Sequence, residues 1–220
     1  TPDGIIWAAT QITGLLRIEP LSSQINTETH DSERSNTIAS NWLYSLTTDK
    51  DGNIWIATAE AGVSKYEPNI KRFTNFFHSE SDDTSLSSNQ ASYIYADANG
   101  RVWAATSTGL NLFIPESNNF VRYTSYNSGL PEDVVISVYQ SREGKYWVGT
   151  LSGLASGMQT DFQTFNRAQA NLSNDSVNAF TETVDGSLWV GTDDGLNRLP
   201  PGSTSFQWIT EDTKPRLPRP

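Results

Sequence analysis

One short pattern recurs five times along the chain, and it consists of a Gly, a Trp three residues later, a Thr three residues after the Trp, and then a second Gly. The five Trp residues are Trp7, Trp55, Trp103, Trp147 and Trp189, at intervals of 48, 48, 44 and 42 residues. Intervals of this size are typical of one four-stranded blade of a β-propeller. The repeat therefore predicts five similar units that pack side by side.

Each unit reads as a series of short strands rather than helices. Apolar, β-branched and aromatic stretches such as "NWLYSLTTD" and "QASYIYADA" precede the first Gly and predict an innermost strand, and the Trp segment predicts a second strand. Asp51-Gly52, Asn99-Gly100 and Asp185-Gly186 supply residues of positive φ for a hairpin between these two strands. The second Gly of the pattern predicts another turn, into a third strand.

A fourth, outer strand is predicted 15 to 18 residues after the Trp in four of the units. It carries an aromatic residue in each of them, namely Phe73, Phe120, Phe162 and Phe206. The first unit has Ile25 at this position and lacks an innermost strand. We therefore predict an all-β protein of about five four-stranded blade units, the first of them incomplete.

The repeated Trp residues are predicted to be structural anchors. A small sheet cannot bury both of its faces alone, so a large apolar residue at a fixed strand position is expected to press on the next sheet. Each indole could bury about 150–250 Å², which corresponds to an upper limit of about 4–6 kcal/mol per Trp. The alternative is that the Trp residues are stacking surfaces for a ligand, which is less common for aromatic residues at a fixed strand position.

The domain organisation follows from the repeat. The units span about residues 1–37, 38–85, 86–129, 130–171 and 172–209, and the Pro-rich residues 210–220 are expected to be a tail or linker. Two interpretations remain open: a five-bladed ring with an incomplete first blade, or part of a larger propeller. The sequence favours the larger propeller, with seven blades and about 300 residues. Open blade edges would then favour self-association.

The last unit carries the clearest resemblance to a known family. Leu172-Ser173-Asn174-Asp175, Asp185-Gly186, Trp189-Val190-Gly191-Thr192 and Gly195-Leu196-Asn197 resemble the two-component regulator propeller repeat, and similar motifs extend from Asp3 to Ile209. The resemblance implies the periplasmic sensor region of a bacterial hybrid histidine kinase or diguanylate cyclase. It therefore implies an extracytoplasmic, non-catalytic, ligand-sensing propeller, with any kinase or cyclase domain elsewhere.

Candidate binding residues follow from propeller geometry. Loops that enter the innermost strands, and loops between the second and third strands, emerge on one face around the mouth of the channel. This face is expected to carry Asn41, Trp42, Asn89, Asp133, Asp175, Asp193 and Asp194. Amides and carboxylates there could bind a small molecule, an oligosaccharide or an adjacent sensor domain. The alternatives are local capping of the turns, a Trp42 that plugs the wall, and a solvated Asp193-Asp194 turn.

Other function classes find little support in the sequence. The formal net charge of -10 disfavours nucleic acid and anionic membrane surfaces, and no apolar run reaches the roughly 18 residues of a membrane span. The chain has no Cys, and His30 and His78 lie in polar loops that show no metal or triad motif. We expect no enzyme, metal or cofactor. The alternatives are a propeller lyase that resembles the streptogramin lyases and a purely structural interaction propeller.

Overall fold

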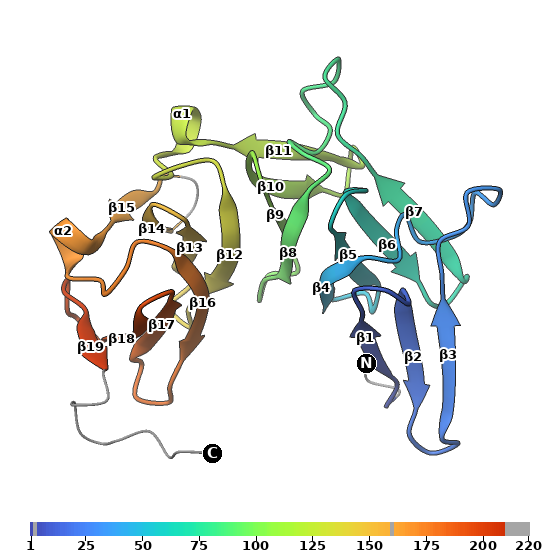
Figure 1. The fold of residues 1–220 in the computed structure, drawn as a ribbon, viewed down its shortest axis with the longest axis horizontal. Helices are drawn as coiled ribbons and strands as arrows, with labels where there is room; N and C mark the ends of the chain where they lie inside the picture. The colour runs from blue at the N-terminus through green and yellow to red at the C-terminus, as the bar shows by residue number, and fades with distance from the viewer. Residues whose placement is uncertain (2–3, 159–160, 210–220) are drawn as a thin grey trace. The chain divides into compact units, whose positions relative to one another are not determined.

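The structure is a computed structural model that describes residues 1, 4–158 and 161–209 (Figure 1). It contains five antiparallel sheets, which we call blades 1 to 5 in chain order. The all-β propeller architecture that the repeat predicts is confirmed. The predicted Pro-rich tail, residues 210–220, lies outside the described residues.

Blade 1 has three strands and each other blade has four, with consecutive strands paired in antiparallel fashion. Blade 1 consists of β1 (Ile6–Ala9), β2 (Leu15–Glu19) and β3 (Gln24–Glu28). Blade 2 consists of β4 (Leu43–Thr48), β5 (Ile54–Thr58), β6 (Val63–Glu67) and β7 (Arg72–Phe76). Blade 3 consists of β8 (Ala91–Ala96), β9 (Val102–Thr106), β10 (Gly109–Ile114) and β11 (Asn119–Tyr123).

The last two blades follow the same order and are each preceded by a short helix. Blade 4 consists of β12 (Val135–Gln140), β13 (Tyr146–Thr150), β14 (Gly153–Gly157) and β15 (Gln163–Phe165). Blade 5 consists of β16 (Val177–Glu182), β17 (Leu188–Thr192), β18 (Gly195–Leu199) and β19 (Gln207–Ile209). The helices are α1 (Ser125–Ser128) and α2 (Arg167–Ala170). None of the described helices has the length and apolar character needed to cross a membrane.

The chain divides into two compact units, which we describe separately. Unit 1 is residues 1–122 and holds blades 1 to 3, whereas unit 2 is residues 123–220 and holds blades 4 and 5. Within each unit the first strands of consecutive four-stranded blades are neighbours: β4 lies beside β8, and β12 lies beside β16. In unit 1 the backbone N–H of Ile94 donates to Ser45 Oγ across this boundary, at 3.4 Å.

Three of the repeated Trp side chains, Trp7, Trp55 and Trp147, lie between consecutive blades of one unit. Trp7 of blade 1 contacts Tyr66 of blade 2, with ring centroids 5.3 Å apart, and Trp55 of blade 2 contacts Phe113 of blade 3 at 4.7 Å. Trp147 of blade 4 belongs to one buried cluster with Phe206 of blade 5. The indole therefore faces the blade that follows its own, and we call this side of a blade its front.

The turn between the first two strands differs in detail from the predicted hairpin. Only its Gly has positive φ, 82° at Gly52 and 78° at Gly100, whereas the residue before the Gly does not. In blades 2 and 3 the turn is closed instead by an Asp six residues before the Trp, a position that the sequence did not predict. Asp49 Oδ1 accepts the N–H of Asn53 at 2.9 Å, and its Oδ2 accepts the indole N–H of Trp55 at 2.7 Å.

Each innermost strand contains a register shift next to its second residue. The shift skips Tyr44, Ser92, Ile136 and Asn178 in blades 2 to 5. A β-bulge leaves the extra residue unpaired and redirects its side chain. The four bulges occur at the same place in each blade, where the chain enters the sheet, so the side chains at this edge follow a common geometry.

Candidate functional site

The polar residues that precede the innermost strands lie at one edge of each blade, which we call the loop rim. At the loop rim, the loop entering the first strand meets the turn between the second and third strands. Each polar side chain there accepts a backbone N–H from the start of its own incoming loop. The pairs are Asn41 with His30, Asn89 with His78, Asp133 with Ser125, and Asp175 with Arg167, all at 2.6–2.7 Å. Each of these hydrogen bonds closes an incoming loop, because it joins two residues that are 8 to 11 positions apart in the sequence.

The two histidines occupy equivalent positions in the loops of blades 2 and 3. His30 Nδ1 donates to the carbonyl oxygen of Ile38 at 2.9 Å, and His78 Nδ1 lies 2.7 Å from the carbonyl oxygen of Leu86. The hydrogen bonds of the two loops thus coincide. Both imidazoles are engaged through Nδ1 in holding their loops.

A pocket of about 400 Å³ opens at the loop rim of unit 1. It is lined by Gln11, Ile12, His30, Ala39, Ser40, Asn41, Trp42 and Glu60. The structure therefore brings the predicted residues Asn41 and Trp42 together, whereas Asn89 lies on the next blade and does not line this pocket. His30, Gln11 and Ser40 were not predicted.

Polar groups in this pocket are available to a ligand. Asn41 uses its Oδ1 for the loop hydrogen bond, and its Nδ2 has no hydrogen-bond partner among the described residues. The Glu60 carboxylate likewise has none there. One amide donor and one carboxylate acceptor thus face the same small volume as the indole of Trp42.

Two aromatic side chains are exposed beside this pocket. The exposed fractions of Trp42 and Tyr44 are 45% and 48%. Their ring centroids are 6.0 Å apart, with an angle of 68° between the ring planes. Tyr44 is the bulge residue of β4, which explains why so large a side chain leaves the sheet. No residue pattern in the sequence marks this position.

In unit 2 the predicted acidic residues are paired with amides. Asp193 Oδ1 accepts from Asn178 Nδ2 at 2.8 Å, and Asp194 Oδ2 accepts from Asn174 Nδ2 at 2.7 Å. The hydrogen bond from Asn178, together with one from Ser176, lowers the pKa of Asp193 below its usual value. Within residues 4–158 and 161–209, no three His, Asp or Glu side chains form a group suited to a metal ion.

Comparison with known proteins identifies the repeat. The family model of the two component regulator propeller matches residues 37–60, 85–108, 129–152 and 171–194. Each match covers the incoming loop and the first two strands of one four-stranded blade. Blades 2 to 5 carry the two-component regulator propeller repeat. The regulator propeller motif thus includes the loop rim and the anchor Trp of blades 2 to 5.

Solved structures share the fold of this regulator propeller. The extracellular domain of the hybrid two component system BT3049 from B. thetaiotaomicron is 22% identical, with a TM-score of 0.80 over 93% of this chain and 28% of that one. The extracellular domain of the one component system BT4673 from the same organism is 16% identical, with a TM-score of 0.66 over 94% and 36%. Virginiamycin B lyase from Staphylococcus aureus is 13% identical, with a TM-score of 0.72 over 96% and 68%.

The regulator propeller thus spans 28% and 36% of the two extracellular domains that it resembles. No curated protein sequence matches the chain. At these identities the structural likeness supports the fold.

Proposed function

We propose that this chain is the ligand-recognising part of a bacterial signalling protein, located on the extracytoplasmic side, and that it binds an oligosaccharide at the loop rim of unit 1. In this proposal the ligand lies against Trp42 and Tyr44, and occupancy is transmitted through blade packing to output domains elsewhere. The propeller itself performs no chemistry on the ligand.

The observation that carries the proposal is the exposure of Trp42 and Tyr44 beside unpaired polar groups. Two large aromatic side chains that are almost half exposed forgo much of the burial free energy available to such rings. Indole and phenol faces suit the apolar faces of sugar rings. The free Nδ2 of Asn41 and the carboxylate of Glu60 supply the donor and the acceptor that fix the orientation of a hydroxylated ligand.

The comparisons give the biological setting of the proposal. The matched family is that of propellers in two component regulators, and two of the similar folds are extracellular domains, one of a hybrid two component system and one of a one component system. In our proposal the propeller has the recognition role, and an extracytoplasmic location would bring it into contact with external saccharides.

The proposal is tested by a binding screen with neutral oligosaccharides on the 220-residue chain, read out by isothermal titration calorimetry. We expect at least one oligosaccharide to bind, and Trp42→Ala to weaken it at least about fivefold, since one stacked aromatic contributes about 1 kcal/mol or more. Tyr126→Ala is the matched control, because Tyr126 is 98% exposed and lies in α1 of unit 2. A screen without any binder, or binding that is equal in both variants, contradicts the proposal.

The fold likeness to virginiamycin B lyase supports one catalytic alternative. In that case His30 or His78 would act on a substrate, although both imidazoles hold incoming loops through Nδ1. Incubation with virginiamycin B distinguishes the two functions. Cleavage that is lost in a His30→Gln, His78→Gln double variant would establish the alternative, and our proposal expects no cleavage.

The outward faces of the first and last blades support a second part of the proposal, self-association. Ile25 of blade 1 is 64% exposed, whereas Phe73 at the equivalent position of blade 2 is 8% exposed. Trp189 on the front of blade 5 is only partly buried, unlike Trp55, which is 1% exposed. Each blade boundary within a unit joins a Trp front to an apolar back, and in our proposal the front of blade 5 packs in the same way on the back of blade 1 in a second copy.

A further inference from the structure

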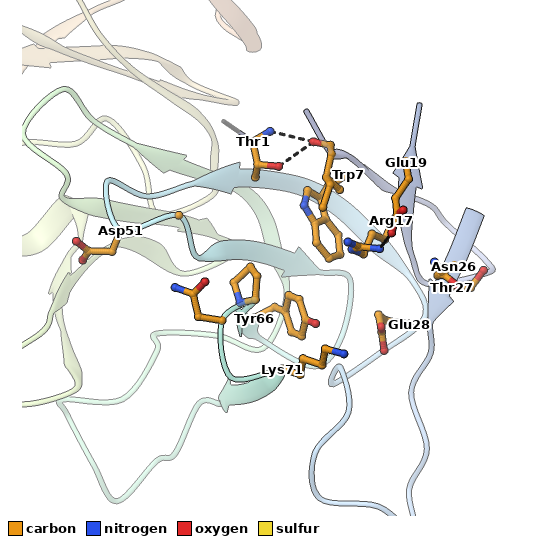
Figure 2. Close-up of a pocket in the computed structure, with 14 residues that line it drawn as sticks. Thr1, Trp7, Arg17, Glu19, Asn26, Thr27, Glu28, Asp51, Tyr66 and Lys71 are labelled. Carbon is orange, nitrogen blue, oxygen red and sulfur yellow. Dashed lines mark hydrogen bonds and ion pairs between the residues drawn. The ribbon is translucent and has the colours of Figure 1, made fainter. Parts of the chain in front are cut away.

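A second and larger cavity lies in unit 1, between the front of blade 1 and the back of blade 2 (Figure 2). Its volume is about 830 Å³. Asp51 and Gly52 of the turn between β4 and β5 are among its lining residues, and it shares no lining residue with the loop-rim pocket. Cavities of about 300–1,000 Å³ are typical of small-molecule sites.

The cleft exists because blade 1 departs from the repeat at one position. In blades 2 and 4 an aromatic residue of the outer strand packs beside the anchor Trp: Phe76 lies 5.6 Å from Trp55, and Phe165 lies 6.0 Å from Trp147. The corresponding residue of blade 1 is Glu28, which pairs with Leu15 as Phe76 pairs with Val63. A carboxylate thus takes the place of an aromatic ring on the front of blade 1. The indole of Trp7 is therefore left open to the cleft.

The cleft combines an aromatic wall with three charged side chains, Glu28, Lys71 and Asp51, that have no ion pair among the described residues. Trp7 and Tyr66 form the wall, with an angle of 59° between their ring planes. Neither the Glu28 carboxylate nor the Lys71 amine has a hydrogen bond or an ion pair with any described residue, whereas Arg17 is paired with Glu19. Figure 2 shows Glu28, Lys71 and the Tyr66 hydroxyl at the same end of the cleft, with Asp51 at the other.

The hydroxyl of Tyr66 remains a hydrogen-bond donor in this setting. Burial raises its pKa above the usual value, and the Glu28 carboxylate raises the pKa further, against a smaller opposing effect of Arg17. One end of the cleft therefore offers an anionic acceptor, a cationic donor and a neutral donor within reach of an apolar wall.

We propose that this cleft binds a zwitterionic ligand with an apolar side chain, that is, a free α-amino acid or a short peptide. Its ammonium group pairs with Glu28, its carboxylate pairs with Lys71 and accepts from the Tyr66 hydroxyl, and its side chain lies on Trp7. Hydrogen bonds between ionised partners are roughly twice as strong as neutral ones. A neutral polyol would leave both protein charges without a counter-charge, so the unpaired Glu28 and Lys71 favour the zwitterion.

The test is calorimetric titration of the 220-residue chain with leucine, phenylalanine and the dipeptide Leu-Phe. We expect binding of at least one of them, and at least tenfold weaker binding of N-acetyl-leucine, which lacks the ammonium group, and of leucine methyl ester, which lacks the carboxylate. The comparison of leucine with Leu-Phe distinguishes a free amino acid from a peptide. Absence of binding by all three zwitterionic probes overturns the proposal.

Substitutions locate the binding. Glu28→Gln and Lys71→Met each remove one charge at similar length, and we expect each to weaken zwitterion binding at least tenfold. Glu116→Gln is the matched control, an exposed carboxylate of blade 3 outside the cleft. Unchanged binding in both cleft variants, with thermal unfolding like that of the parent, overturns the assignment. Trp42→Ala is expected to leave zwitterion binding unchanged, which separates this result from the test of the loop rim.

Discussion

At the scale of single residues, the packing between blades 4 and 5 depends on one glycine. A Cβ on Gly149 would lie 2.6 Å from the carbonyl oxygen of Val177 and 2.6 Å from Ser137 Oγ, whereas a Cβ on Gly191 of blade 5 would meet nothing closer than 3.9 Å. We expect Gly149→Ala to destabilise the protein by about 1–3 kcal/mol, because backbone of the next blade must shift. Gly191→Ala is the control, and its free energy of unfolding, measured in urea, should stay near that of the parent protein. Equal stabilities of the two variants would contradict this packing.

A second prediction at this scale concerns acid stability. The Thr183 hydroxyl and the N–H and hydroxyl of Ser187 donate to Asp185, and the Arg198 guanidinium also contacts it, so that its pKa is lowered in the folded protein. A carboxyl group with a lowered folded pKa contributes stability above its unfolded pKa of about 4, and this contribution is lost as the pH falls. Asp185→Asn should therefore flatten the fall in melting temperature between pH 5 and pH 2. An unchanged slope would count against these hydrogen bonds.

At the scale of structural elements, the outer strand of each four-stranded blade holds its own incoming loop. The residue two positions after the outer Phe donates a side-chain hydrogen bond to a carbonyl oxygen of that loop. The pairs are Asn75 with Thr37, Arg122 with Ser85, Thr164 with Gly129, and Trp208 with Asn171. The loop is therefore fixed on the outside by this strand and on the inside by the Asn or Asp of the loop rim.

Arg122 makes the largest set of these hydrogen bonds, and it allows a test. Its guanidinium donates to Ser85 O and Asp82 O at 2.8 Å and to Leu86 O at 3.0 Å. Arg122→Ala should speed amide exchange in residues 79–87 more than tenfold, since a hydrogen bond from a charged group contributes about 1.5–3 kcal/mol. Arg34→Ala, an exposed residue of the preceding loop, should not. Exchange rates that are alike in both variants would show that the loop does not depend on the arginine.

The sequence predicted some parts of these elements and could not predict others. The Trp, Gly and outer Phe residues recur as the same residue type, so a single chain shows the blades by self-comparison. The outer-strand position that holds the incoming loop is occupied by Asn, Arg, Thr and Trp in the four blades. These side chains share only a hydrogen-bond donor, so no residue type marks the position in the sequence. Tyr44 was missed for a similar reason, because its exposure follows from a bulge in the strand. The importance of Glu28 follows only from the strand pairing, in which Glu28 occupies the position that Phe76 has in blade 2.

At the scale of the whole molecule, the unmatched faces of blades 1 and 5 predict association of copies. The apolar face around Ile25 and the front of blade 5 around Trp189 have no covering blade among the described residues. We expect the apparent mass in light scattering to rise with protein concentration, and Ile25→Glu to return it to that of a monomer, because a buried unpaired charge opposes the contact. Ile12→Glu, at an 83% exposed residue of the loop rim, is the control. A concentration-independent monomer would contradict the prediction.

The central claim is that packing between consecutive blades of a unit buries Trp55 and Trp147 and leaves Trp42 and Tyr44 exposed to recognise a ligand. A crystal structure with the tightest-binding oligosaccharide of the screen tests it most directly. The claim predicts electron density for the sugar against Trp42 and Tyr44, with a hydrogen bond to Asn41 or Glu60. Density for the sugar at another surface, with Trp42 and Tyr44 free of it, would contradict the claim.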